Sequence, residues 1–205
     1  MKFEILKGIE HLSKQDKVLS TLIKNYGICN LRPRRKYFNL LLKSIVGQQL
    51  SVTAANSIWQ KFSAFYKGNP RPELVLNTPH ETLRSFGLSN AKARYVKDLS
   101  QKLIDGEINL KNISSKTDEE ITEELTKVKG IGIWTVHMFL IFTLGRLNIL
   151  PHSDLGIRKG VMINYGLKKL PDEKKINKIA KINNWHPYCS VVSLYMWQSL
   201  DNVPF

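Results

Sequence analysis

Hydrophobic residues recur at helical spacing along most of the chain, whereas patterns typical of strands are scarce. In one segment Val18, Leu19, Leu22 and Ile23 fall on one face, and Gly27 ends the pattern. The same spacing elsewhere predicts about ten short helices and an all-α fold class. We expect these helices to begin near Ser13, where Ser13 and Asp16 have the spacing of a capping box, and near Tyr37, Ser51, Thr78, Ser89, Thr117, Ile133, Leu155, Pro171 and Pro187.

Capping residues support several of these starting points. Thr117 and Glu120 have the spacing of a capping box, and Thr78 with Glu81 repeats it. Asp154 stands immediately before the apolar residues of a later helix, where an N-cap residue is expected. The segment 68–78 contains two prolines and predicts a loop.

Composition adds information about size and partners. The chain has 205 residues, of which 42% are hydrophobic, enough to build a core in one domain or in two small lobes. Its formal net charge is +14. Such a charge attracts polyanions, nucleic acid being the commonest and an anionic membrane surface the second.

Several classes of protein are excluded. Charges at Lys2, Glu4 and Lys7 interrupt any signal-peptide core, and the apolar run 138–142 is far shorter than the ~20 residues of a membrane span. Cys29 and Cys189 are too few for a disulfide framework, a four-cysteine zinc site or an iron–sulfur cluster. We expect a soluble, intracellular protein with two unpaired thiols.

A glycine-containing turn between two predicted helices is the first candidate for chemistry. Its sequence is Lys129-Gly130-Ile131-Gly132. Glycine allows positive φ angles and close backbone approach, and the N–H groups that begin the next helix could bind a phosphate. The alternative is a turn that only packs two helices together.

Asp154 is the second candidate, because it follows the turn after one apolar helix and a loop. A carboxylate at a helix N-terminus accepts backbone N–H groups and is stabilised by the helix dipole. The alternative is that Asp154 only caps the helix.

Taken in order, these features resemble the helix-hairpin-helix DNA glycosylases, in which a hairpin precedes a catalytic aspartate. The resemblance covers roughly residues 37–200 and rests on four segments: KSIVGQQLSVTAANSIW, GLSNAKARYVKDL, LTKVKGIGIWTVHMFLIFTLGRLNILPHSDLG and NWHPYCSVVSLYMW. The fold it implies has two helical lobes, with the active site in the cleft between them. The predicted lobes are residues 37–146 and residues 1–36 plus 147–205.

Within the family the chain resembles the alkyladenine branch, 3-methyladenine-DNA glycosylase II and its compact fungal and short bacterial relatives. Trp134 stands where bifunctional members have a Schiff-base lysine, and the four-cysteine cluster of endonuclease III is missing. Met138 replaces an aromatic residue of the larger bacterial relative, and Cys189 replaces an arginine that many members have.

The resemblance implies a monofunctional hydrolase of base excision repair. Such an enzyme flips an alkylated purine, 3-methyladenine or 7-methylguanine, out of duplex DNA, hydrolyses its N-glycosidic bond and leaves an abasic site. It needs no organic cofactor. Two alternatives stay open: a glycosylase for another damaged or deaminated base, and a non-catalytic protein that binds damaged DNA.

The resemblance also assigns roles to residues. Asp154 is the catalytic carboxylate, and Trp134, Trp185 and Met138 are expected in the base pocket, with a core position as the alternative for each tryptophan. Trp59 and Trp197 are assigned to the core. The residues expected to bind DNA are Gln49, Leu50, Ser51, Lys129, Gly130, Gly132 and Thr135.

Two further roles concern the loops. Gln49 or Leu50 would be the wedge that fills the gap left by the flipped base, unless Gln48 and Gln49 only form hydrogen bonds within their turn. The backbone carbonyls of Thr126, Val128 and Ile131 would bind a structural sodium or potassium ion in the DNA complex.

The expected partner is therefore double-stranded DNA with alkylated bases, and no membrane. We expect a monomer located in the cytoplasm or nucleoid, or in the nucleus of a eukaryotic cell.

Overall fold

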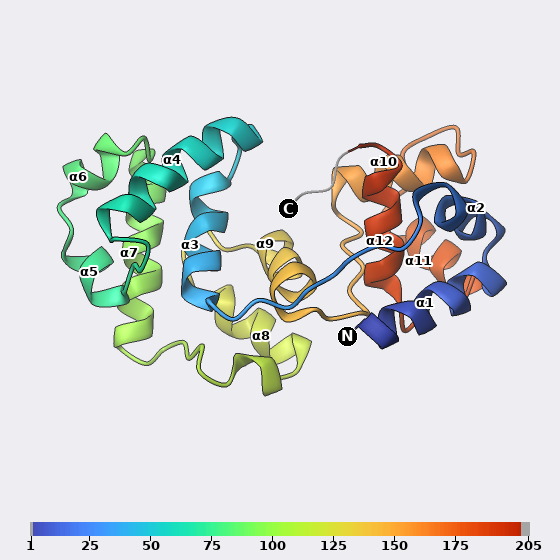
Figure 1. Ribbon diagram of the computed structural model, residues 1–205, viewed down its shortest axis with the longest axis horizontal. Coiled ribbons are helices and arrows are strands. Elements are labelled where there is room, and N and C mark those ends of the chain that lie inside the picture. The colour runs from blue at the N-terminus through green and yellow to red at the C-terminus, as the bar shows by residue number, and fades with distance from the viewer. Residues whose placement is uncertain (1, 202–205) are drawn as a thin grey trace. The chain divides into compact units, whose positions relative to one another are not determined.

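The computed structural model describes residues 2–201, which form twelve α-helices, one 3₁₀ turn and one π-helical segment, with no strand among them (Figure 1). This confirms the all-α prediction. The elements are α1 Lys2–Gln15, α2 Lys17–Tyr26, α3 Tyr37–Gly47, α4 Val52–Phe65, α5 Pro72–Asn77, α6 His80–Ser85, α7 Asn90–Ile104, η1 Ile113–Ser115, α8 Asp118–Leu125, α9 Ile133–Met138, η2 Phe139–Leu144, α10 Leu155–Asn164, α11 Glu173–Ile182 and α12 Cys189–Gln198.

The chain divides into two compact units. Unit 1 comprises Met1–Arg34 and Leu140–Phe205, and unit 2 comprises Arg35–Phe139. The helices α3 to α9 therefore belong to unit 2, and α1, α2 and α10 to α12 belong to unit 1. The lobes expected from the sequence had their limits at residues 36/37 and 146/147.

Two helices are additional to those predicted. The helix α1 buries Ile5, Gly8 and Leu12 and continues past Ser13, so the expected start of the first helix at Ser13 is wrong. The next helix, α2, begins after Asp16, which is its N-cap. The helix α5 lies inside the segment 68–78, so the prediction of a loop is wrong there. Pro72 begins α5 at its first turn, where proline removes no helical hydrogen bond and its fixed φ suits the helix.

The apolar segment after the hairpin also differs from the prediction. The segment is α-helical from Ile133 to Met138, and η2 continues it as a π-helix from Phe139 to Leu144. Gly145, with φ +73°, follows the π-helix, as the sequence predicted for the helix end. The boundary between the two units falls where the α-helical geometry changes to π-helical geometry.

The predicted caps have mixed outcomes. Thr117 and Glu120 form the expected capping box at α8, and Asp154 caps α10. The second capping box is wrong, because Pro79 occupies the N-cap position of α6 without a side-chain hydrogen bond. The hydroxyl of Thr78 instead donates to the carbonyl of Leu74 at 2.7 Å, which leaves it unavailable to cap α6.

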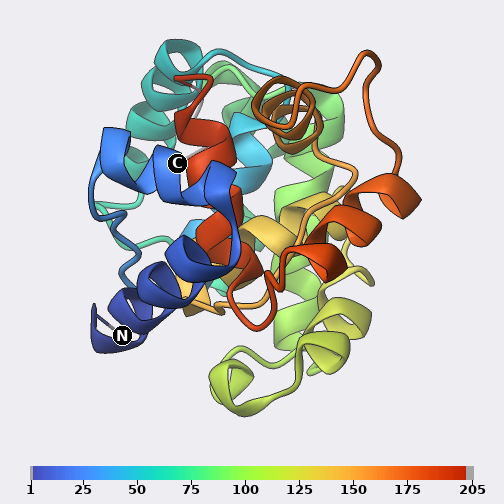
Figure 2. The same cartoon turned by 90° about the vertical axis from the view of Figure 1, so that its right-hand side faces the viewer.

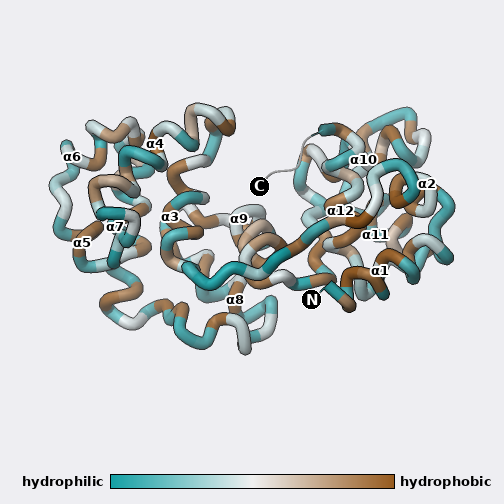
Figure 3. Tube along the Cα trace, viewed as in Figure 1, coloured by the Kyte–Doolittle hydropathy of each residue, from teal (hydrophilic) through white to brown (hydrophobic). Residues whose placement is uncertain are grey.

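The core of unit 2 forms between α3, α4 and the pair α5 and α7. Its residues are apolar and buried: Leu41, Leu42, Ile45, Phe62, Val75, Val96 and Leu99. Figure 3 shows hydrophobic positions along α3 in contrast to the hydrophilic segment that leads into it. That segment contains Arg32, Arg34, Arg35 and Lys36, so the basic residues lie outside the core.

The core of unit 1 is built around α12, in which every residue from Cys189 to Trp197 is buried. Figure 2 shows α12 beside α1 and α2, and α10 packs on it as well. Two glycines in α10 permit this contact. A Cβ atom at Gly160 would lie 2.7 Å from the backbone oxygen of Met196, and Gly156 lies one turn earlier on the same face.

Asp16 joins three parts of unit 1 through one buried carboxylate, which is 2% exposed. It caps α2 by accepting the N–H groups of Val18 at 2.8 Å and Leu19 at 3.2 Å. Its other oxygen accepts the Trp185 indole at 2.8 Å and the Tyr165 hydroxyl. Burial and this neighbouring carboxylate raise the pKa of Tyr165.

We predict that Asp16→Ala lowers the free energy of unfolding by about 3 kcal/mol, because it removes a cap and leaves the buried Trp185 donor and the half-buried Tyr165 donor without this acceptor. Urea denaturation followed by circular dichroism measures the change. Asp172→Ala is the control, since Asp172 is an exposed N-cap that accepts from Lys175 N at 2.8 Å in the same unit. Equal losses in the two variants would contradict a special role for Asp16.

Candidate functional site

The predicted site residues divide between the two units. Unit 1 contains Asp154 and Trp185. Unit 2 contains the residues expected at the loop, the hairpin and the following helix: Gln49, Leu50, Ser51, Thr126, Val128, Lys129, Gly130, Ile131, Gly132, Trp134, Thr135 and Met138.

The hairpin turn lies between the end of α8 at Leu125 and the start of α9 at Ile133. Gly130 has φ +85°, and a Cβ atom there would lie 2.2 Å from Cδ2 of Tyr95. Glycine is therefore required at residue 130 for both conformational and steric reasons. Gly132 has φ −99°, and a Cβ atom there would meet nothing within 4 Å, so no described part of the chain requires glycine at residue 132.

Side chains from other elements hold the hairpin in place. Asp98, on α7, accepts the backbone N–H of Lys129 at 2.8 Å. The side-chain amide of Gln48 donates to the carbonyl of Gly130 at 2.7 Å. Because Gln48 ends α3, this bond connects the hairpin to the loop between α3 and α4.

Lys92 fixes the same loop from α7. Its ammonium group donates to the carbonyls of Val46 at 2.8 Å and Gln48 at 2.6 Å, and burial lowers the pKa of this amine. The sequence segments contained Lys92 and Gln48, but nothing in their spacing revealed this role. The contacts join residues 44 and 82 positions apart, beyond the range of helical periodicity.

The candidate wedge residues are exposed in the α3–α4 loop. Gln49 adopts φ +56°, and the side chain of Leu50 is 40% exposed. Gln48 forms a hydrogen bond, as the alternative interpretation proposed, but its partner is Gly130 of the hairpin. Ser51 caps α4 by accepting the N–H of Ala54 at 3.3 Å.

The helix α9 presents its predicted site residues differently. Trp134 is 38% exposed, so a fully buried core position does not describe it. Thr135 and Met138 are buried. The Thr135 side chain therefore offers almost no exposed surface for a DNA contact, whereas its backbone N–H lies in the first turn of α9.

The predicted cation ligands are backbone carbonyls on the hairpin. The Val128 carbonyl already accepts the N–H of Ile131 at 3.0 Å, and a carbonyl oxygen has a second lone pair. Carbonyl oxygens are a ligand type that sodium and potassium accept, so the donors of Thr126, Val128 and Ile131 fit such an ion chemically. Within residues 2–201, no group of three or more His, Cys, Asp or Glu side chains could hold a metal.

Asp154 is held by donors from two helices. Its Oδ1 accepts the backbone N–H of Ile157 in α10 at 2.8 Å and the indole N–H of Trp197 in α12 at 2.8 Å. Trp197 is buried, as predicted, but its contact with Asp154 was missed. A Cβ atom at Gly156 would lie 2.8 Å from Cδ1 of Trp197, so this glycine leaves room for the indole.

The loop before Asp154 is also attached to α12. Ser190 donates its hydroxyl to the Arg146 carbonyl at 2.7 Å and accepts the Ile149 N–H at 3.0 Å. Its backbone N–H donates to the Leu147 carbonyl at 2.9 Å. The two ends of α12 thus fix the loop and the carboxylate that follows it.

Trp185 lies in the core of unit 1. It is fully buried, donates to Asp16 at 2.8 Å and has the Tyr165 ring 5.9 Å away. This is the environment of a core tryptophan, which was the alternative to the predicted base-pocket position.

Cys189, where the resemblance stated above leads to the expectation of an arginine, is also buried. Burial raises the pKa of its thiol to about 12. The thiol therefore supplies neither the positive charge nor the exposed donor that an arginine would provide.

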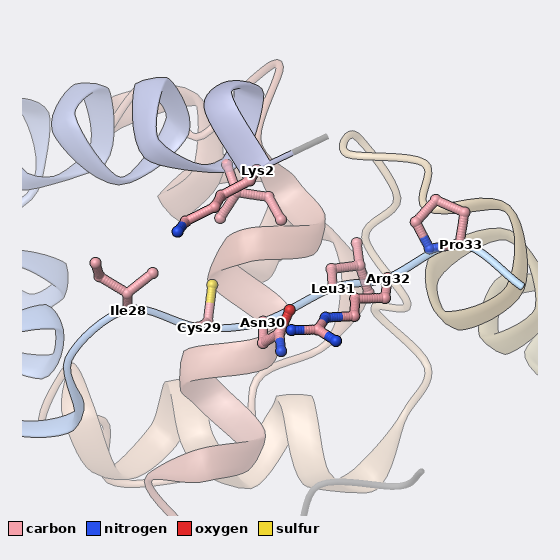
Figure 4. A pocket seen from close by; sticks show the side chains of 8 residues that line it. Lys2, Ile28, Cys29, Asn30, Leu31, Arg32 and Pro33 are labelled. Atoms are coloured by element: carbon pink, nitrogen blue, oxygen red, sulfur yellow. The ribbon is translucent and has the colours of Figure 1, made fainter.

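A cavity of about 400 Å³ lies elsewhere in unit 1 (Figure 4). It is lined by Lys2, Ile5, Ile28, Cys29, Asn30, Leu31, Arg32 and Pro33, none of which was predicted as a site residue. The structure also contains no helix, among the residues it describes, that is long and apolar enough to span a membrane.

Known proteins are similar to this chain over most of its length. The chain is 33% identical over 195 residues to the alkylbase DNA glycosidase-like protein mag2 of Schizosaccharomyces pombe, covering 92% of this chain and 91% of that protein. It is 30% identical over 200 residues to the putative DNA-3-methyladenine glycosylase YfjP of Bacillus subtilis, covering 94% and 68%.

A solved structure is similar throughout. The 3-methyladenine DNA glycosylase Mag1 of Schizosaccharomyces pombe, in complex with abasic DNA, gives a TM-score of 0.83 at 32% identity, covering 97% of this chain and 98% of that one. A family model described as HhH-GPD superfamily base excision DNA repair protein matches residues 42–184. The chain therefore belongs to the HhH-GPD superfamily of base excision DNA repair proteins.

Proposed function

We propose that this protein is a monofunctional DNA glycosylase that removes alkylated purines from duplex DNA and leaves an abasic site. The observation that carries the proposal is the position of Asp154. Asp154 is partly exposed and stands at the N-terminus of α10, and its carboxylate is oriented by the Ile157 and Trp197 donors. Names of the similar Schizosaccharomyces pombe and Bacillus subtilis proteins support the alkylated substrate.

The chemistry needs little acid catalysis. A methyl group at N3 or N7 makes the purine cationic, so the base leaves with the bonding electrons of its N-glycosidic bond. Positive charge then develops on the deoxyribose, where the Asp154 carboxylate would stabilise it. Water forms the new bond at C1′ and loses a proton, and Asp154 would also orient that water.

The electron-rich face of Trp134 is suited to a cationic base. The residue is 38% exposed, and cation–π attraction contributes about 0.5–2 kcal/mol. Trp134 has no amine for a Schiff base at this position, which supports hydrolysis without a lyase step.

The hairpin and the α3–α4 loop would hold the DNA. The formal net charge of +14 supplies the general attraction to phosphates, and the N–H groups at the start of α9 supply a local anion site. No contact among the described residues requires glycine at residue 132, so close approach by a phosphate is a reason for it to lack a side chain. Exposed Gln49 and Leu50 are the wedge candidates.

We predict that Asp154→Asn lowers the rate of methylpurine release from methylated duplex DNA by at least about 100-fold, because the variant loses the negative charge that stabilises the sugar. Chromatography of the released bases measures this rate. Asp172→Asn is the control, because Asp172 caps α11 in the same unit. Undiminished release by folded Asp154→Asn would remove Asp154 from the mechanism, and no release by the wild type would contradict the proposed substrate.

The two hairpin glycines should respond differently to substitution. Gly132→Ala should weaken binding to an abasic duplex, measured by fluorescence anisotropy at fixed salt, while its stability stays within about 1 kcal/mol of the wild type. Gly130→Ala should lower stability by about 2 kcal/mol or more, because of its φ angle and Tyr95. Wild-type affinity in Gly132→Ala would argue against a phosphate at this turn.

The wedge can be tested with the double variant Gln49→Ala, Leu50→Ala. We expect its retention of an abasic duplex to fall about tenfold, because filling the vacated base position is worth a few kcal/mol at most. Dissociation rates measure retention. Val52→Ala is the matched control, since Val52 is 73% exposed beside the same loop. Equal retention by the double variant and the control would place the wedge elsewhere.

A further inference from the structure

We propose that Trp197 and Gly156 act together as positioning residues that fix the Asp154 carboxylate for the reaction. The indole N–H of Trp197 holds Oδ1, and the missing side chain at residue 156 lets the indole reach it. This inference rests on the proposed function, because it concerns how Asp154 is oriented toward a substrate.

The second donor exceeds what a helix cap requires. An N-cap carboxylate needs a backbone N–H from the first turn, which Ile157 supplies at 2.8 Å. The Trp197 bond, also 2.8 Å, comes from a different helix, 43 residues away in sequence. The first bond fixes the carboxylate relative to α10, and the second fixes it relative to α12.

Trp197 is itself held rigidly enough to act in this way. It is fully buried, and the Phe142 ring lies 5.7 Å away at an interplanar angle of 33°. An indole nitrogen can only donate, so a buried indole without an acceptor would be unfavourable. The donor is therefore oriented toward Oδ1 before any substrate is bound, as preorganised electrostatic catalysis requires.

Gly156 is adapted to this contact by its lack of a side chain. Its backbone does not have a positive φ, so conformation alone does not call for glycine. A Cβ atom there would lie 2.8 Å from Cδ1 of Trp197, 3.0 Å from its Nε1 and 3.0 Å from Oδ1 of Asp154. An added methyl group would have to displace the indole or the carboxylate.

The same unit contains an internal control for the indole–carboxylate contact. Trp185 donates to Asp16 at 2.8 Å, both residues are buried, and Asp16 has no role in the proposed reaction. Replacing Trp185 by phenylalanine removes a buried indole donor of the same kind without touching Asp154.

The test is the single-turnover rate of methylpurine release at saturating enzyme, measured beside the affinity for an abasic duplex. Trp197→Phe should lower the rate about 10- to 100-fold, because catalytic groups tolerate little misplacement, while affinity stays near the wild-type value. Trp185→Phe should keep the wild-type rate in its folded fraction.

A double-mutant cycle decides whether Trp197 acts through Asp154. In the Asp154→Asn background, Trp197→Phe should cause no further loss, since the charge that it orients is already absent. A multiplicative loss in the double variant, or a wild-type rate in Trp197→Phe alone, would overturn the inference.

Gly156→Ala tests the same contact with the indole present. We expect a loss of rate similar to that of Trp197→Phe. Gly8→Ala is its control, because a Cβ atom there would meet the Tyr188 ring at 2.6 Å in the same unit without touching Asp154. A full rate in folded Gly156→Ala would count against the inference even if Trp197→Phe does not fold.

Nuclear magnetic resonance separates this inference from the proposed function. The four tryptophan indole N–H signals are assigned by single phenylalanine variants. Asp154→Asn should shift the Trp197 signal and leave the Trp185 signal in place, and an unshifted Trp197 signal would contradict the contact. Absence of base release by the wild type would overturn the proposed function itself, and the catalytic role of the contact with it.

Discussion

The close contact between α10 and α12 is the constraint on which the position of Asp154 depends. Glycine inside a helix is less favourable than alanine by about 0.5–1 kcal/mol, and α10 contains two, one turn apart. Gly160 lets the α10 backbone approach Met196, and Gly156 leaves space for the Trp197 indole. The two glycines therefore make α10 less stable as a helix, and the one at residue 156 allows the buried Trp197 donor to reach the Asp154 carboxylate.

Unit 2 fixes its loops by a related principle. The hairpin and the α3–α4 loop are exposed segments, yet each is attached to the helical scaffold by side chains of other elements. Asp98 accepts a hairpin N–H, Gln48 bonds a hairpin carbonyl, and Lys92 bonds the two carbonyls of the neighbouring loop. Segments proposed to contact DNA are therefore supported by rigid helices, which lowers the entropy lost on binding.

The features that the sequence could predict depend on near neighbours. The capping box of Thr117 and Glu120 and the cap at Asp154 involve residues three positions apart, and Gly130 belongs to a short turn. The helix α5 was missed because proline suits both a loop and the first turn of a helix. Family resemblance, rather than spacing, is the source of the catalytic role expected for Asp154. The contacts that could not be predicted join residues far apart in the chain, as Trp185 meets Asp16 across 169 positions. A tryptophan on an apolar helix was rightly expected in the core at Trp197, but the pattern could not show which acceptor its indole N–H would find.

The two indole–carboxylate pairs of unit 1 differ in how exposed the aspartate is. Both have an indole donor at 2.8 Å from an N-cap aspartate. Asp16 is 2% exposed and its oxygens are occupied by backbone, indole and phenol donors, so it stabilises the fold. Asp154 keeps part of its surface exposed. Only a carboxylate that is both oriented and accessible can stabilise charge on a substrate, so of the two aspartates only Asp154 meets the requirements of the proposed catalytic role.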